Sequence, residues 1–279
     1  MNVLAEISSY FPSLTKSEQK VAQYVLANPD DIETKSIQEL AKTVSVGEST
    51  IVRFARKIGY SGYQDFKLAI VKSQLFESNA EPKGKEEKEN QIEEIVYYQY
   101  ADALNETLQF LNEQKEKLNR IAEKINNADG VYLLAAGNST TVAADLGNRL
   151  IRIGKKTMFY PDSHIQAINA SVMKENDLVI AISVSGNTED ILKNLEIAQK
   201  TDASIAAITN YLNSGVFQYT EDVLVCSSKE FPSISGSFTA KMSQLYAIDV
   251  LFHKVVNLDK ENIQKMREHT NNALLDRLN

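Results

Sequence analysis

Residues 178–188 read LVIAISVSGNT, an apolar run that passes directly into a loop of hydroxyls, a glycine and an amide. A short, continuous apolar run of this kind is typical of a strand that is covered on both faces. Similar runs occur at 131–135, 157–160, 205–209 and 223–226, and helical patterns such as 140–153 and 188–200 separate them. Strands that alternate with helices predict a five-stranded parallel sheet flanked by helices.

Before residue 79 every pattern is helical. The stretches Thr15–Glu18 and Ser36–Glu39 are capping boxes, and the second of them starts a short helix that is apolar on one face. After a three-residue break at 44–46, apolar side chains recur at helical spacing, namely Ile51, Phe54, Ala55 and Ile58. Two short helices joined by such a turn predict an all-α helix-turn-helix domain.

The segment 79–90, NAEPKGKEEKEN, separates these two halves. It has no large apolar side chain and mixes Glu with Lys, so burial cannot compensate for the entropy of ordering it. We therefore expect a helix-turn-helix domain at 1–78, a linker at 79–90 and an α/β domain at 91–279 that begins with helices. A last helix is expected at 238–256.

Composition excludes several classes of protein. The chain has 279 residues, is 43% hydrophobic and carries a net charge of −7, which is ordinary for a globular protein. Cys226 is its only cysteine and the three histidines lie far apart, so we expect no intramolecular disulfide, no metal site and no cofactor. No run of eighteen apolar residues and no signal-peptide pattern occur, so we expect a cytoplasmic protein without a membrane partner.

The charge is unevenly distributed, because residues 45–72 hold five Lys or Arg against two acidic residues. Opposite the apolar stripe of the second short helix, Ser49, Arg53 and Arg56 recur at helical spacing, with Thr50 and Lys57 beside them. Small polar residues let a helix approach base edges, and Arg or Lys pairs with guanine or phosphate. The face predicts contact with double-stranded DNA, although any surface helix carries a charged side. Lys67 is a further candidate phosphate contact.

Two hydroxyl-rich loops follow predicted strands and lead into helices. The first is Gly137-Asn138-Ser139, and the second holds Ser183, Ser185, Gly186, Asn187 and Thr188. Backbone N–H groups at a helix N-terminus, together with hydroxyls, make a small anion site that suits phosphate. The alternative is an ordinary helix cap with a turn glycine. Neither loop has the P-loop or dinucleotide pattern, which disfavours a nucleotide.

The two loops resemble the phosphate-binding loops of the sugar isomerase (SIS) domain, which has a flavodoxin-like fold. Together with TKSEQKVAQYVLANP (15–29), SIQELAKTVSVGESTIVRFARKIGYSGYQDFK (36–67) and SGSFTAKMSQLYAIDVL (235–251), the chain resembles the RpiR/MurR family of bacterial transcription regulators. This resemblance implies a helix-turn-helix paired with an SIS domain that senses a phosphorylated sugar. It also implies a homodimer or homotetramer.

Carried over residue by residue, the resemblance assigns the phosphate to Ser139, Ser183, Ser185 and Thr188. It assigns the DNA to Ser49, Thr50, Arg53 and Arg56. Two positions depart from the family pattern: Gly47 stands where Ser is usual at the start of the second helix, and Lys241 stands where Arg is frequent. The role of Lys241 therefore stays open.

Two further residues are candidates for the sugar. His164 follows the second predicted strand and could bind a hydroxyl or an amide, although a surface or capping histidine fits equally. Glu230 follows the fifth strand and resembles the acidic residue that SIS isomerases use near the sugar, although a surface carboxylate is the simpler interpretation.

The leading hypothesis is a DNA-binding regulator of sugar catabolism genes whose effector is a phosphorylated sugar. An amino-sugar 6-phosphate is one of several effectors that the residues allow. The alternative is an aldose-ketose phosphosugar isomerase with an added helical domain, in which Glu230 and His164 would supply the base and the acid. A sugar-phosphate binding protein that does not contact DNA is a third hypothesis.

Overall fold

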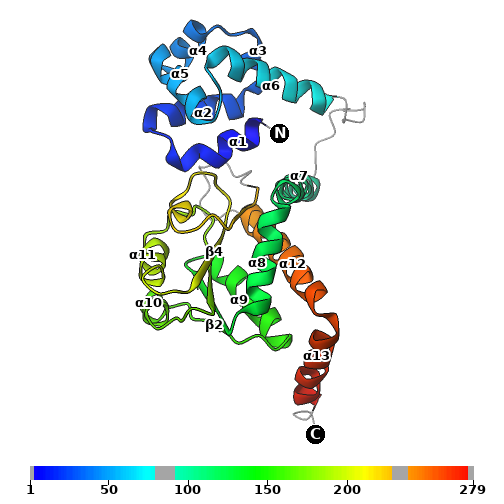
Figure 1. Ribbon diagram of the computed structural model, residues 1–279. Coiled ribbons are helices and arrows are strands. Elements are labelled where there is room, and N and C mark those ends of the chain that lie inside the picture. The colour runs from blue at the N-terminus through cyan, green and yellow to red at the C-terminus, as the bar shows by residue number, and fades with distance from the viewer. Residues whose placement is uncertain (1–2, 79–91, 228–237, 276–279) are drawn as a thin grey trace. The chain divides into compact units, whose positions relative to one another are not determined.

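The computed structural model describes residues 3–78, 92–227 and 238–275. The chain forms two compact units, residues 1–99 with 211–213 and residues 100–210 with 214–279, each with its own hydrophobic core (Figure 1). The predicted linker at 79–90 lies outside the described residues, so the domain boundary placed there stays a prediction.

The first unit contains helices and no strand in its described part. Its helices are α1 (Val3–Tyr10), the short 3-10 helix Phe11–Ser13, α2 (Lys16–Ala27), α3 (Pro29–Thr34), α4 (Ile37–Val44), α5 (Glu48–Lys57) and α6 (Tyr63–Ser78). Both predicted capping boxes are present, at Thr15 and at Ser36. Phe54 of α5 and Phe66 of α6 are fully buried and meet edge to face at 5.5 Å, so aromatic packing holds these two helices together.

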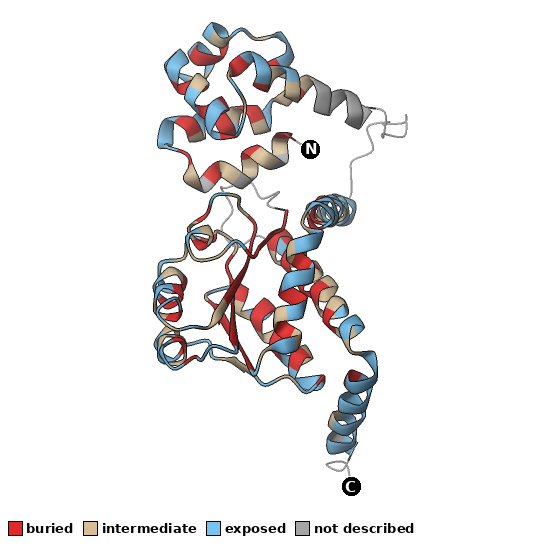
Figure 2. Ribbon diagram, viewed as in Figure 1, coloured by how far each residue is buried: buried red, intermediate tan, exposed pale blue. Residues whose placement is uncertain are grey.

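The second unit is built on a five-stranded parallel sheet in the order β2-β1-β3-β4-β5. Its strands are β1 (Gly130–Ala135), β2 (Thr157–Phe159), β3 (Asp177–Ile182), β4 (Ser204–Thr209) and β5 (Val223–Val225). Every residue of β3 is buried, which explains why its sequence from Leu178 to Ile182 is continuously apolar rather than alternating (Figure 2). This architecture confirms the predicted fold class.

Helices cover both faces of the sheet (Figure 1). One face carries α8 (Lys115–Asn127), α9 (Ser139–Arg152) and α12 (Phe238–Leu258), and the other carries α10 (Ser163–Ser171) and α11 (Glu189–Ala198). The remaining elements are α7 (Ile92–Glu113), the 3-10 helix Gly215–Gln218 and α13 (Lys260–Leu275). Cys226, directly after β5, is fully buried. Within the described ranges, no helix is long and apolar enough to cross a membrane.

Candidate functional site

The turn between α4 and α5 fixes how these two helices meet. Ser45 adopts a left-handed conformation with φ of 56°, and the N–H of Val46 donates to the carbonyl of Ala41 at 3.0 Å, which ends α4 sharply. Gly47 then stands at the N-cap of α5 in an extended conformation, without a side chain to cap the helix. The three residues Ser45, Val46 and Gly47 therefore make the short turn that a helix-turn-helix needs.

The outer face of α5 presents Ser49, Arg53 and Arg56, and all three are exposed. Thr50 differs from them, since it is buried at 7% exposure and its hydroxyl accepts a hydrogen bond from Arg53 Nη2 at 3.4 Å. Arg56 Nε donates to the carbonyl of Ser61 at 3.3 Å. Both arginines thus lie on the exposed face of α5, and the Thr50 hydroxyl orients Arg53.

The two lysines predicted to contact DNA have partners within the domain. Lys57 Nζ donates to the carbonyl of Ser13 and forms an ion pair with Glu18 Oε2 at 3.4 Å. Burial raises the pKa of Glu18, but hydrogen bonds from Thr15 and the charge of Lys57 outweigh it, so that the pKa lies below its usual value. Lys67 Nζ donates to the carbonyl of Lys35 at 3.0 Å. The geometry gives Lys57 and Lys67 structural roles, and their contact with DNA stays a prediction.

The first hydroxyl-rich loop follows β1. Gly137 has a φ of 56°, and the hydroxyl of Thr140 donates to its carbonyl at 2.7 Å. Asn138 is exposed at the N-cap of α9, whereas Ser139 is the first residue of that helix and is buried at 5% exposure. The loop therefore turns tightly and places the Ser139 hydroxyl at a helix N-terminus.

The second loop follows β3 and is held by its own hydroxyls. Ser183 Oγ and Thr188 Oγ1 lie 3.0 Å apart, and Ser183 Oγ also accepts from the N–H of Gly186 at 3.1 Å. Ser185 Oγ accepts from the N–H of Asn187 at 3.1 Å. Three hydroxyls thus line a preformed loop that leads into α11.

Gly186 is required at its position in this loop. Its φ is 60°, and a Cβ added there would lie 2.2 Å from Ser214 Oγ and 2.7 Å from Thr209 Oγ1. Its neighbour Asn187 is exposed, and its side-chain oxygen accepts from the N–H of Gly215 at 2.6 Å. Asn187 therefore joins the loop to the segment after β4, which is a supporting role.

The two loops leave adjacent strands. β1 and β3 pair in parallel with Ala135 opposite Ile182, so both loops start at the same edge of the sheet. Gln166 of α10, which no sequence pattern indicated, supports this edge of the sheet through hydrogen bonds to its backbone. Its buried amide donates to the carbonyls of Ala135 at 2.8 Å and Tyr160 at 2.7 Å, and its oxygen accepts from the N–H of Ala135 at 3.2 Å. A glutamine in a short helix gives no sequence signal of this role.

The remaining candidates are placed less closely. His164 is exposed in the first turn of α10, where its backbone N–H donates to Asp162 Oδ1 at 2.9 Å. Lys241 of α12 is half-buried, with Nζ 5.2 Å from the ring centre of Phe238. Glu230 lies outside the described residues. Within those residues, no three His, Cys, Asp or Glu side chains are grouped as metal ligands.

Comparison with known proteins agrees with both predicted domains. Residues 1–75 match the family model for the helix-turn-helix domain of the rpiR family, and residues 124–254 match the SIS domain model. A Haemophilus influenzae protein described as an uncharacterized HTH-type transcriptional regulator is 30% identical over 99% of this chain and 97% of its own length. The chain belongs to the RpiR family of transcriptional regulators.

Two solved structures resemble the regulator. The NanR protein of Vibrio vulnificus, solved in complex with ManNAc-6P, is 28% identical, covers 99% of this chain and 98% of its own, and has a TM-score of 0.64. The sugar isomerase domain of an RpiR transcription factor from Sphaerobacter thermophilus covers 66% of this chain and 99% of its own, at 22% identity and a TM-score of 0.58. The second likeness concerns the fold alone.

Proposed function

We propose that this regulator binds operator DNA through the exposed face of α5 and responds to a phosphorylated sugar bound at the loops after β1 and β3. The observation that carries the proposal is the preformed set of hydroxyls, in which Ser183, Ser185 and Thr188 are ordered by contacts within their own loop. Such donors need no rearrangement to accept a ligand, so less binding free energy is lost in ordering them.

Phosphate is the group that fits these loops best. The N-termini of α9 and α11 both lie at this edge of the sheet, and the partial positive charge of a helix N-terminus favours an anion. Ser139, from the first loop, adds its hydroxyl to those of the second. We assign the phosphate to these four hydroxyls and the sugar to the other predicted candidates, His164, Glu230 and Lys241.

An amino-sugar phosphate is the effector class that we favour. The Vibrio vulnificus NanR, which matches nearly the whole chain, was solved with ManNAc-6P. We infer that this chain binds a ligand of the same class and assembles as a homodimer or homotetramer. Because an effector shifts an equilibrium only through a difference in affinity, it must bind one arrangement of the paired DNA-binding domains more tightly than another.

We infer that the regulator is not a phosphosugar isomerase. Isomerisation needs an acid and a base held against the sugar carbons. Within residues 3–78, 92–227 and 238–275, no group holds the His164 side chain in a fixed position, and it is exposed. An enzyme also has no use for two arginines on the outer face of α5.

The proposed binding to operator DNA is tested by fluorescence anisotropy with promoter fragments from the DNA next to the regulator's own gene. Arg53→Ala with Arg56→Ala is expected to abolish specific binding, because each arginine that reads a base or phosphate contributes about 1–3 kcal/mol. The matched control is Lys193→Ala with Lys200→Ala, which removes two positive charges from exposed positions on the other unit. Equal loss in both double variants would contradict the assignment of α5.

The effector part is tested by thermal shift against phosphorylated sugars, each paired with its unphosphorylated form. An effector at a hundred times its dissociation constant is expected to stabilise the protein by about 2.7 kcal/mol. Ser183→Ala with Ser185→Ala is expected to remove the shift while leaving DNA binding intact. A shift that persists in that variant, or one that the unphosphorylated sugar reproduces, would place the ligand elsewhere.

A further inference from the structure

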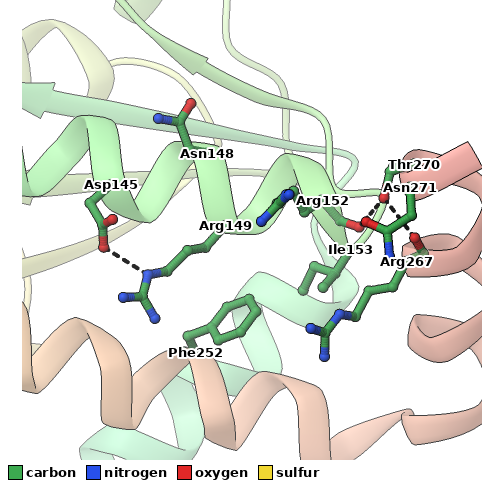
Figure 3. A pocket seen from close by; sticks show the side chains of 9 residues that line it. All are labelled: Asp145, Asn148, Arg149, Arg152, Ile153, Phe252, Arg267, Thr270 and Asn271. Atoms are coloured by element: carbon green, nitrogen blue, oxygen red, sulfur yellow. Dashed lines mark hydrogen bonds and ion pairs between the residues drawn. The ribbon is translucent and has the colours of Figure 1, made fainter. Parts of the chain in front are cut away.

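A pocket lies at the opposite end of α9 from the hydroxyl-rich loops, between α9, α12 and α13 (Figure 3). Its volume is about 450 Å³, which is within the range of small-molecule sites. It is lined by Asp145, Asn148, Arg149, Arg152, Ile153, Phe252, Arg267, Thr270 and Asn271. Three of these side chains are guanidiniums, and they come from two helices that lie far apart in the sequence.

Packing fixes the helix that closes this pocket. Gly154, two residues after the end of α9, has a φ of 84°, and a Cβ added there would lie 3.0 Å from Met266 Cγ of α13. Ile263 is buried at 3% exposure, and the hydroxyl of Thr270 donates to the carbonyl of Arg152 at 3.0 Å. These contacts hold α13 against the end of α9 and bring Arg267 to the pocket.

Arg149 is already neutralised. It donates to Asp145 at 2.7 Å and to Asp249 at 2.5 Å, and its guanidinium lies 5.8 Å from the ring centre of Phe252. His253 lies 3.8 Å from the same Asp249. The carboxylates of Asp145 and Asp249 therefore both pair with Arg149, and its guanidinium is held against the ring of Phe252.

Arg152 and Arg267 are different. Within the described residues, neither side chain has an ion pair or a hydrogen bond, although both line the pocket. The helix dipole favours basic residues in the last turn of α9, which accounts for Arg149 and Arg152. It does not account for Arg267, which α13 adds from the other side (Figure 3). Two cationic groups without a counter-charge favour the binding of an anion.

We propose that this pocket binds a phosphorylated small molecule, at a site separate from the hydroxyl-rich loops. Two guanidinium groups can share the oxygens of one phosphate dianion. A single carboxylate carries one negative charge, so it would leave part of their positive charge unpaired. The amides of Asn148 and Asn271 offer further donors, and Ile153 with Phe252 forms an apolar wall for the organic part. Because α9 has 14 residues, the two sites lie about 20 Å apart along one helix.

The test is calorimetric titration of the full chain with pyrophosphate at constant ionic strength, with chloride as the reference. Titration is done in the Ser183→Ala, Ser185→Ala background, so that binding at the loops does not contribute. Binding is expected to persist there and to weaken by about tenfold or more on adding Arg152→Gln and Arg267→Gln. The matched control adds Lys260→Gln and Lys265→Gln, which remove the same charge from exposed positions of α13.

Three results would overturn the proposal of an anion site in this pocket. Absence of pyrophosphate binding in the loop-variant background, or equal weakening by the lysine control, overturns the proposal. So does sedimentation that shows the arginine variant dissociating while pyrophosphate has no effect, because the pocket would then hold acidic side chains of a second copy. Failure of phosphosugars to bind the loops leaves this proposal standing, since the two sites are measured separately.

Discussion

The substitution Gly186→Ala separates two physical costs that meet at one residue of the loop after β3. The left-handed backbone there, with φ of 60°, costs a residue with a Cβ about 1–2 kcal/mol. The new methyl group would also lie 2.2 Å from Ser214 Oγ and 2.6 Å from Ser214 Cβ, an overlap that typically costs a further 1–3 kcal/mol. We expect a total loss of about 2–5 kcal/mol in the free energy of unfolding.

Gly137→Ala is the matched control in the same unit. Gly137 has a similar φ of 56°, but an added Cβ would meet nothing within 4 Å, so only the backbone cost of about 1–2 kcal/mol applies. Differential scanning calorimetry of the full chain measures both variants, and each kcal/mol corresponds to about 2–4 °C for a unit of this size. If Gly186→Ala lowers the melting temperature no more than Gly137→Ala, the close contact inferred at Ser214 is wrong.

Three other substitutions test contacts that support the sites. Glu18→Gln is expected to destabilise the protein above about pH 4.5 and to have less effect as the pH falls through the lowered pKa of Glu18; melting curves at pH 7 and at about pH 3 check this, and a constant difference would contradict it. Gln166→Leu removes a donor from the buried carbonyl of Ala135 and from the carbonyl of Tyr160, so urea unfolding is expected to show a loss of about 1–3 kcal/mol; a neutral result would mean that the amide does not hold the sheet edge. Thr50→Val removes the hydrogen bond to Arg53 and keeps the shape, so operator affinity measured by anisotropy is expected to fall about fivefold with little change in melting temperature; unchanged affinity would show that Thr50 does not orient the arginine.

The sheet was predictable because its strands are buried on both faces. The apolar runs that were predicted to be strands begin at residues 131, 178 and 205. Each lies within one residue of the first residue of β1, β3 or β4. The two capping boxes were equally visible, because their residue types and spacing are local. Features that depend on a local pattern of residues were therefore predictable from the sequence alone.

Long-range contacts were not predictable in this way. The helical spacing placed Lys57 beside the face of α5 that is predicted to contact DNA, but its partner Glu18 is 39 residues away and no local signal links the two. α10 was missed because its isoleucines, Ile165 and Ile168, are exposed and give no apolar stripe. α13 was missed because Ile263 is the only apolar residue of its described side chains that is buried.

The buried position of Cys226 has a practical consequence for measuring how the regulator works. Burial raises the pKa of its thiol to about 12, so the thiolate that reacts with maleimide dyes is scarce at neutral pH. As Cys226 is the only cysteine, a Lys42→Cys variant would carry a single reactive site on the exposed surface of α4. Spin labels or fluorophores attached there would report the distance between DNA-binding domains of an oligomer, with and without effector, in a protein whose native thiol needs no replacement.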